Sequence, residues 1–263
     1  MSGSGLPLWL FLVSVVAVAI VIAVGSIWLG NRILPTRRYG KEPNPAIASF
    51  LTVVGFIYGA LLGFTVVATW EHFSSTQVVV SGEASALTTM YRQTVAMPEP
   101  ERTEVQELLR KYAGAVAGPE WNKQRNDGAR AAITRMYRTV GRQQPNVAAK
   151  PINQQFLNQL SELASDRNER IVGTKPRIPA LMWAGLILGA VVLVAFTGFL
   201  RMASTVGHVI VSGTVAVLLG VLLCVVFQLD HSYATDQRIT SGPFQHALDI
   251  FDSVDNDSRY FPR

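Results

Sequence analysis

The sequence predicts an all-α polytopic membrane protein, with four transmembrane helices and a helical polar domain between the second and third. Hydrophobic residues make up 49 % of the 263 residues and charged residues only 16 %, below the roughly 25 % charge typical of soluble domains. The apolar residues are concentrated in four long blocks that are nearly free of charge. A block of about 18 or more apolar residues can cross a ~30 Å hydrocarbon core, and inside lipid it must be helical.

The first block, residues 1–30, is predicted to be transmembrane helix 1. It holds no basic residue, and its apolar run is longer than the core of a signal peptide. We therefore expect a retained helix rather than a cleaved leader. Residues 31–45 form a basic connecting loop, with four Arg or Lys residues against one Glu. The other three transmembrane helices are predicted at 46–70, 178–200 and 206–229.

The segment 71–177 is predicted to be the helical polar domain, since it contains no apolar run of spanning length. Apolar side chains recur there at helical spacing in four stretches, which prolines and glycines separate. The first stretch has no proline until Pro98, so we expect it to continue transmembrane helix 2 into solvent. The helices expected in this domain run from about 71 to 97, 101 to 117, 129 to 140 and 152 to 172. The polar tail, 230–263, is expected to hold one short helix at 244–251.

No motif for enzymatic chemistry occurs in the sequence, and its four histidines are scattered. We therefore predict that the chain is not an enzyme and that it has no cofactor or metal site. The single cysteine, Cys224, lies in the fourth span, where a buried apolar role is expected. The net charge of +5 suits basic loops next to lipid better than nucleic acid. The expected partners are the lipid bilayer and small ions.

Two acid–histidine pairs stand at the water ends of predicted spans. Glu71 and His72 follow the second span, and Asp230 and His231 follow the fourth. One interpretation is an interface latch that pairs across helices and responds to protons. The other is that all four are solvated interface residues.

The second span contains a stripe of small residues, Gly55, Gly59 and Gly63, spaced four apart. Such a stripe lets helix backbones approach closely, so these glycines are predicted to form a helix-packing face.

Phe56, Ala60 and Phe64 are also spaced four apart, on the adjacent face of the same span. Rings of apolar side chains from symmetry-related helices can close a pore by dewetting, so one interpretation is a pore constriction. The alternative is that these side chains contact the chain's own helices. No Asp, Glu, Lys or Arg lies within a predicted span. Their absence argues against an ion-coupled carrier and fits either a passive channel or a membrane scaffold.

The basic residues flanking the spans do not decide the orientation in the membrane. Five lie on each side: Arg32, Arg37, Arg38, Lys41 and Arg201 against Arg167, Arg170, Lys175, Arg177 and Arg238. The positive-inside rule therefore favours neither side.

Residues between about 50 and 250 resemble the bacterial DUF4239 family, whose members are described as bestrophin-like. The resemblance rests on Trp70, Glu71, Glu83, Ala84, Leu87, Tyr91, Arg92, Pro98 to Arg102, Tyr112, Glu120, Trp121, Pro179, Trp183, Leu229, Asp230 and Gly242 to Phe244. Soon after the Leu-Asp pair, Ser232 and Tyr233 stand where that family usually has proline and phenylalanine.

The resemblance implies a pentameric ion channel with four transmembrane helices per subunit. It also implies a cell-membrane location, with the termini and the polar domain in the cytosol. Phe56, Ala60 and Phe64 match the neck positions of bestrophins, although Ala60 is smaller than the usual occupant. The tail aspartates match neither the calcium clasp of some bestrophins nor an EF-hand loop, so calcium gating is not expected. The rival prediction is a non-conducting scaffold or sensor whose polar domain binds a partner or ligand.

Overall fold

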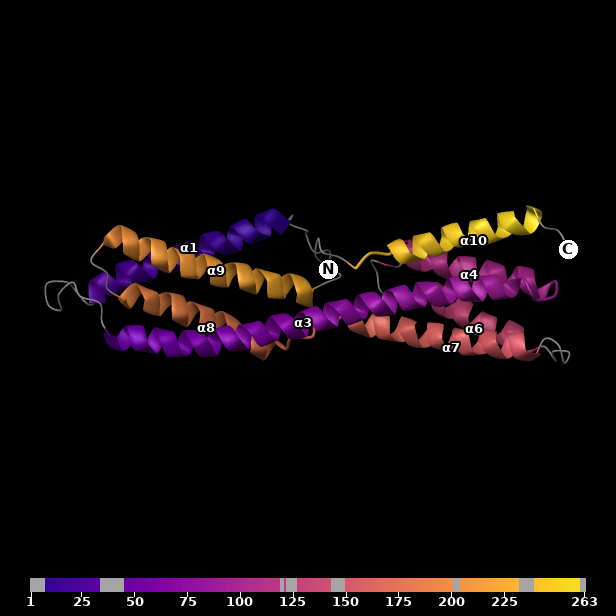
Figure 1. The fold of residues 1–263 in the computed structure, drawn as a ribbon, viewed down its shortest axis with the longest axis horizontal. Coiled ribbons are helices and arrows are strands. Elements are labelled where there is room, and N and C mark those ends of the chain that lie inside the picture. Colours follow the sequence, from indigo (N-terminus) through magenta and orange to yellow (C-terminus); the bar gives the residue numbers. More distant parts are fainter. Residues whose placement is uncertain are drawn as a thin grey trace. The chain divides into compact units, whose positions relative to one another are not determined.

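The computed structural model describes residues 8–33, 45–118, 121, 127–142, 150–200, 204–231 and 239–260. Within these residues it contains eight α-helices and no strand, which confirms the all-α class (Figure 1). The helices are α1 (Leu8–Ile33), α3 (Pro45–Thr94), α4 (Glu101–Ala117), α6 (Asp127–Gly141), α7 (Lys150–Gly173), α8 (Ala180–Phe199), α9 (Thr205–Asp230) and α10 (Gly242–Tyr260).

Four of these helices, α1, α3, α8 and α9, are long and apolar enough to cross a membrane, as predicted. The residues at which the chain enters and leaves the membrane stay predictions. Residues 34–44 of the expected basic loop lie outside the described residues.

The local sequence explains where these helices begin and end. Helix α3 runs without interruption for 50 residues and ends at Thr94, shortly before Pro98 and Pro100. Helix α4 then begins at Glu101, and its first-turn acids suit the positive end of the helix dipole. Ser204 caps α9 by accepting a hydrogen bond from the Gly207 amide at 3.2 Å.

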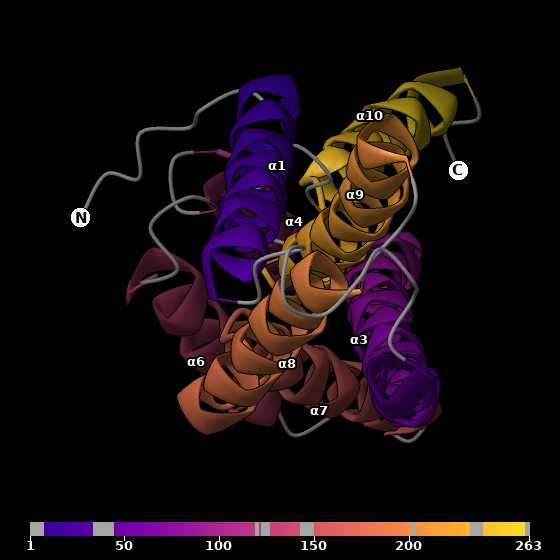
Figure 2. The ribbon, with the colours of Figure 1, turned by 90° about the vertical axis from the view of Figure 1, so that its left-hand side faces the viewer.

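The described chain divides into two compact units. Unit 1 consists of residues 1–73 and 176–238, and it contains α1, α8, α9 and the N-terminal part of α3. Within it, α8 and α9 lie between α1 and α3 (Figures 1 and 2). Its largest core cluster is Tyr58, Leu62, Leu186, Ala190, Leu193 and Val226, all of them buried.

Unit 2 consists of residues 74–175 and 239–263, and it contains α4, α6, α7, α10 and the C-terminal part of α3. Its core is rich in large side chains that solvent does not reach: Leu87, Met90, Tyr91, Leu109, Tyr112, Met136, Phe156, Leu160, Leu163, Phe244 and Phe251. Tyr91 of α3 stacks on Phe251 of α10, with ring centroids 4.1 Å apart. Helix α10, longer than the helix expected in the tail, is therefore part of this unit's core.

Candidate pore helix and the contacts that hold it

One face of α3 in unit 1 is fixed against α8. Tyr58 and Leu62 are buried on this face, and the Tyr58 hydroxyl donates a hydrogen bond to the Leu186 carbonyl at 2.7 Å. The Tyr58 ring lies against Gly189, where an added Cβ would stand 2.5 Å from a ring carbon. A side chain at position 189 would therefore force the Tyr58 ring to move, so the absence of a side chain at Gly189 lets α3 pack against α8 in this way.

The opposite face of α3 carries the predicted constriction residues. Phe56 is 79 % exposed and Phe64 is 76 % exposed, and Ala60 between them is exposed as well. They share one face because residues four apart lie on the same side of a helix. Helix α8 holds the other face, so this one is left open in the single chain. Phe56 and Phe64 are therefore not buried against the chain's own helices. Their role in a pore stays a prediction.

The predicted glycine stripe lies beside this open face. An added Cβ at Gly55, Gly59 or Gly63 would meet no heavy atom within 4 Å. Within the part of the chain that the structure describes, the stripe is thus not used for close helix packing. Its predicted role as a packing face stays a prediction.

The close approaches inside unit 1 use other glycines, which the sequence reasoning missed. An added Cβ at Gly198 of α8 would collide with the backbone of Ser26, and one at Gly30 of α1 would collide with the Gly198 carbonyl. Helices α1 and α8 therefore touch backbone to backbone. Ser26 and Gly30 are themselves a small pair spaced four apart, which is the signal that could have located this crossing.

Asp230, one of the predicted latch residues, is a buried anchor at the end of α9. Its carboxylate accepts hydrogen bonds from the backbone amides of Arg177 and Ile178, at 2.8 and 3.0 Å. The other carboxylate oxygen accepts one from the Trp183 indole at 3.1 Å. Asp230 therefore ties the end of α9 to the chain segment that enters α8.

The other latch residues lie around the same segment or at the surface. The Arg177 guanidinium lies 3.3 Å from Nδ1 of His72. Because a guanidinium can only donate, Nδ1 of His72 is the acceptor in this contact. His231 lies 3.7 Å from the Asp230 carboxylate and 3.2 Å from the Phe227 carbonyl, whereas Glu71 is exposed. The proton-sensitive latch stays a prediction.

Unit 2 is centred on a buried ion pair that the sequence reasoning also missed. Glu83 of α3 accepts hydrogen bonds from Arg170 of α7 at 2.6 and 3.1 Å, and from the Tyr112 hydroxyl at 2.5 Å. Burial raises the pKa of Tyr112 well above its ordinary value of 10, and the Glu83 carboxylate raises it further. Tyr112 therefore stays protonated and donates. The Arg170 guanidinium also lies over the rings of Trp121 and Phe244, at 5.4 and 5.8 Å.

A second charge cluster joins α10 to α4. The Arg110 guanidinium contacts the carboxylates of Asp252 and Asp255, each at 2.7 Å. Asp255 also accepts a hydrogen bond from the Tyr91 hydroxyl at 2.9 Å. Among the described residues no group of three or more His, Cys, Asp or Glu side chains could hold a metal ion.

A family model and solved structures both match this chain. The family model of the Bestrophin-like domain matches residues 17–244. A crystal structure of a bacterial bestrophin homologue from Klebsiella pneumoniae is 14 % identical, with a TM-score of 0.67, and the match covers 91 % of this chain and 98 % of that one. A single-residue variant of that homologue is also 14 % identical, with a TM-score of 0.68, over 92 % of this chain and 99 % of that one. At this identity the structures show a shared fold. No curated protein sequence matches.

Proposed function

The chain belongs to the bestrophin-like family, and from this premise we propose that it is a homo-oligomeric ion channel whose pore is lined by α3. Phe56, Ala60 and Phe64 would form the hydrophobic constriction. By family resemblance the assembly would be a pentamer in the cell membrane, with the polar domain in the cytoplasm.

The observation that carries this proposal is the exposure of Phe56 and Phe64 on a spanning helix whose opposite face is fixed. They are the most exposed aromatic side chains among the described residues. Tyr58 holds the opposite face of α3 against α8, because its hydroxyl is hydrogen-bonded to Leu186 and its ring lies against Gly189. A ring of copies would point these side chains at the axis, where apolar rings exclude water from a narrow pore.

The glycine stripe supports the same assembly. Gly55, Gly59 and Gly63 lie beside the aromatic residues, and an added Cβ at any of them would meet no described heavy atom within 4 Å. Small residues at such spacing let a neighbouring helix approach closely without losing side-chain packing. In a ring, the stripe of one copy would therefore receive the α3 helix of the next.

The first experiment is imaging of the intact particle in detergent. We expect a closed ring with α3 innermost and Phe64 facing the axis. A monomer, or an assembly with α3 away from any axial path, would contradict the channel. It would instead favour a scaffold whose polar domain binds a partner.

The second experiment is ion flux in reconstituted vesicles. Phe64→Ala should raise conductance or leak, because the smaller side chain widens the constriction and lets water enter. The matched control is Leu188→Ala on α8, since Leu188 is also an exposed apolar residue of unit 1, at 63 %. Equal flux in the wild type and both variants would remove Phe64 from the constriction.

A further inference from the structure

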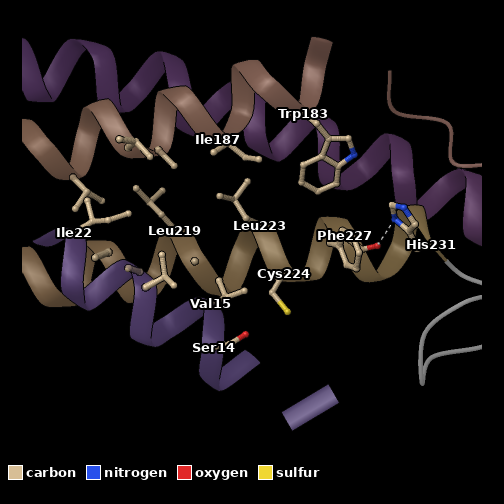
Figure 3. Close-up of a pocket in the computed structure, with 17 residues that line it drawn as sticks. Ser14, Val15, Ile22, Trp183, Ile187, Leu219, Leu223, Cys224, Phe227 and His231 are labelled. Carbon is tan, nitrogen blue, oxygen red and sulfur yellow. Dashed lines mark hydrogen bonds between the residues drawn. The ribbon is translucent and has the colours of Figure 1, made fainter. Parts of the chain in front are cut away.

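A cavity of about 550 Å³ lies within unit 1, with walls from α1, α8 and α9 (Figure 3). Helix α1 contributes Val15, Val18 and Ile22, and α8 contributes Ile187 and Val191. Helix α9 contributes the series Ala216, Leu219, Gly220, Leu223, Cys224 and Phe227. The volume falls in the range of ligand sites, roughly 300–1,000 Å³.

Most of this lining is aliphatic; Trp183 and His231 lie at one end, and Ser14 and Cys224 lie nearer the middle (Figure 3). In Figure 3 the side chains of Ile22, Leu219 and Ile187 lie along the cavity, and those of Trp183, Phe227 and His231 lie at its far end. The stretch of α9 from Ala216 to Phe227 is about 16 Å long at ~1.5 Å per residue. That is close to half of a ~30 Å hydrocarbon core, which is the depth that one acyl chain fills.

The far end of the cavity is a fixed aromatic rim. Trp183 packs edge-on against Phe227 with centroids 6.0 Å apart, and Phe227 stacks on His231 at 4.3 Å. The Trp183 indole is held by its hydrogen bond to Asp230. Amphipathic rings of this kind favour the level of the lipid headgroups. The rim therefore marks the end of the cavity that faces water, and the aliphatic part extends into the membrane.

We propose that this cavity binds one acyl chain of a membrane phospholipid, with the headgroup outside it beside His231. The largely aliphatic walls offer a chain little polar surface to desolvate, with the Ser14 hydroxyl as the polar group on α1. None of the lining residues that the structure describes is Lys or Arg, so the lining holds no cation that would pair with a carboxylate drawn into the cavity. A phospholipid keeps its charged groups in the headgroup layer and presents only an aliphatic chain to these walls.

The test uses the full chain in vesicles of phosphatidylethanolamine and phosphatidylglycerol. A small fraction of the phosphatidylethanolamine carries a diazirine midway along one acyl chain. The protein is extracted into detergent, washed to remove loosely bound lipid, irradiated and mapped by peptide mass spectrometry. We expect the surviving adducts on cavity residues such as Val18, Ile187 and Leu223. Adducts only on outward residues, or none after washing, would overturn the proposal without a variant being needed.

A pair of variants sharpens the result. Ile187→Trp should fill the cavity and lower the retained adducts on α1 and α9 several-fold. Leu188→Trp adds the same group one residue further along α8, outside the cavity lining, and should leave them unchanged. Equal labelling in both variants would contradict the proposal. So would displacement of the probe by oleate but not by unlabelled phospholipid, which would indicate a fatty-acid site. Cross-links from cavity residues to a second copy would mean that a neighbouring subunit fills the space.

Discussion

The helices inside unit 1 and the helices inside unit 2 pack together through different kinds of interaction. In unit 1, helices meet closely at Gly30, Gly189 and Gly198. In unit 2, buried charges and aromatic rings join the helices, as in the Glu83–Arg170 pair. The difference follows from the solvent. Lipid offers helices no hydrophobic gain on association, so close backbone approach has to hold them. Water provides that gain, and a unit with a large core can then enclose charges, provided that each is paired.

The largest effect that this comparison predicts is in unit 2. Arg170→Ala should lower the free energy of unfolding by about 3–5 kcal/mol, because it leaves the Glu83 carboxylate buried without its guanidinium partner. The measurement is denaturant unfolding of the full chain in detergent, followed by a signal from unit 2.

The matched control for this variant is Arg135→Ala. Arg135 pairs with Glu104 at 4.0 Å, but both side chains are largely exposed. Loss of such a surface pair should cost only about 0–1 kcal/mol. If both variants lost a similar free energy of unfolding, burial would not be the reason that one ion pair matters more than the other.

The next largest loss of stability is expected in unit 1. Gly198→Ala should cost about 1–3 kcal/mol, because the added methyl group meets the Ser26 backbone and forces α1 away from α8. The measurement is thermal unfolding in detergent.

Gly59→Ala provides the comparison, because the added methyl group would meet no described heavy atom within 4 Å. If the stripe packs between copies, this variant should weaken the oligomer and leave the fold of each subunit intact. Size-exclusion chromatography with light scattering would detect the change. A less stable subunit with an unchanged oligomer would argue against the assembly proposed above.

The smallest effect concerns a crowded carboxyl group in unit 2. Burial raises the pKa of Asp166 above its ordinary value, and the negative charges of Glu162, Glu83 and Glu169 raise it further. The folded state therefore binds the proton more tightly than the unfolded state does. Stability from this group is lost as the pH rises through the raised pKa. Asp166→Asn should accordingly stabilise the protein at pH 7, and its advantage over the wild type should shrink as the pH falls. An advantage that does not depend on pH would show that the charge is not the cause.

The features predictable from the sequence were those that repeat along one helix. Uncharged apolar blocks located the four spans, and helical spacing placed Phe56, Ala60 and Phe64 on one face. Contacts between helices were not predictable in the same way. Tyr58 carries no sign that its ring lies on a glycine in a span more than a hundred residues away. Glu83 did carry a signal, because it shares an apolar stripe with Val80 and Leu87, and a carboxylate on a buried stripe needs a partner. Its partner, Arg170, could only be identified from the packing of α3 against α7.

The composition of unit 2 has a consequence for how the chain is made. Helix α10 supplies Phe244 and Phe251 to a core whose other parts precede α8, and Asp255 pairs with Arg110 at its edge. At about 5–20 residues per second, the 85 residues from Pro176 to Tyr260 take roughly 4–17 s to synthesise. Helices α8 and α9 are made within that time, before α10, while Tyr91 and Arg110 lack their α10 partners. The nascent polar domain therefore presents an unfinished apolar surface until α10 is complete.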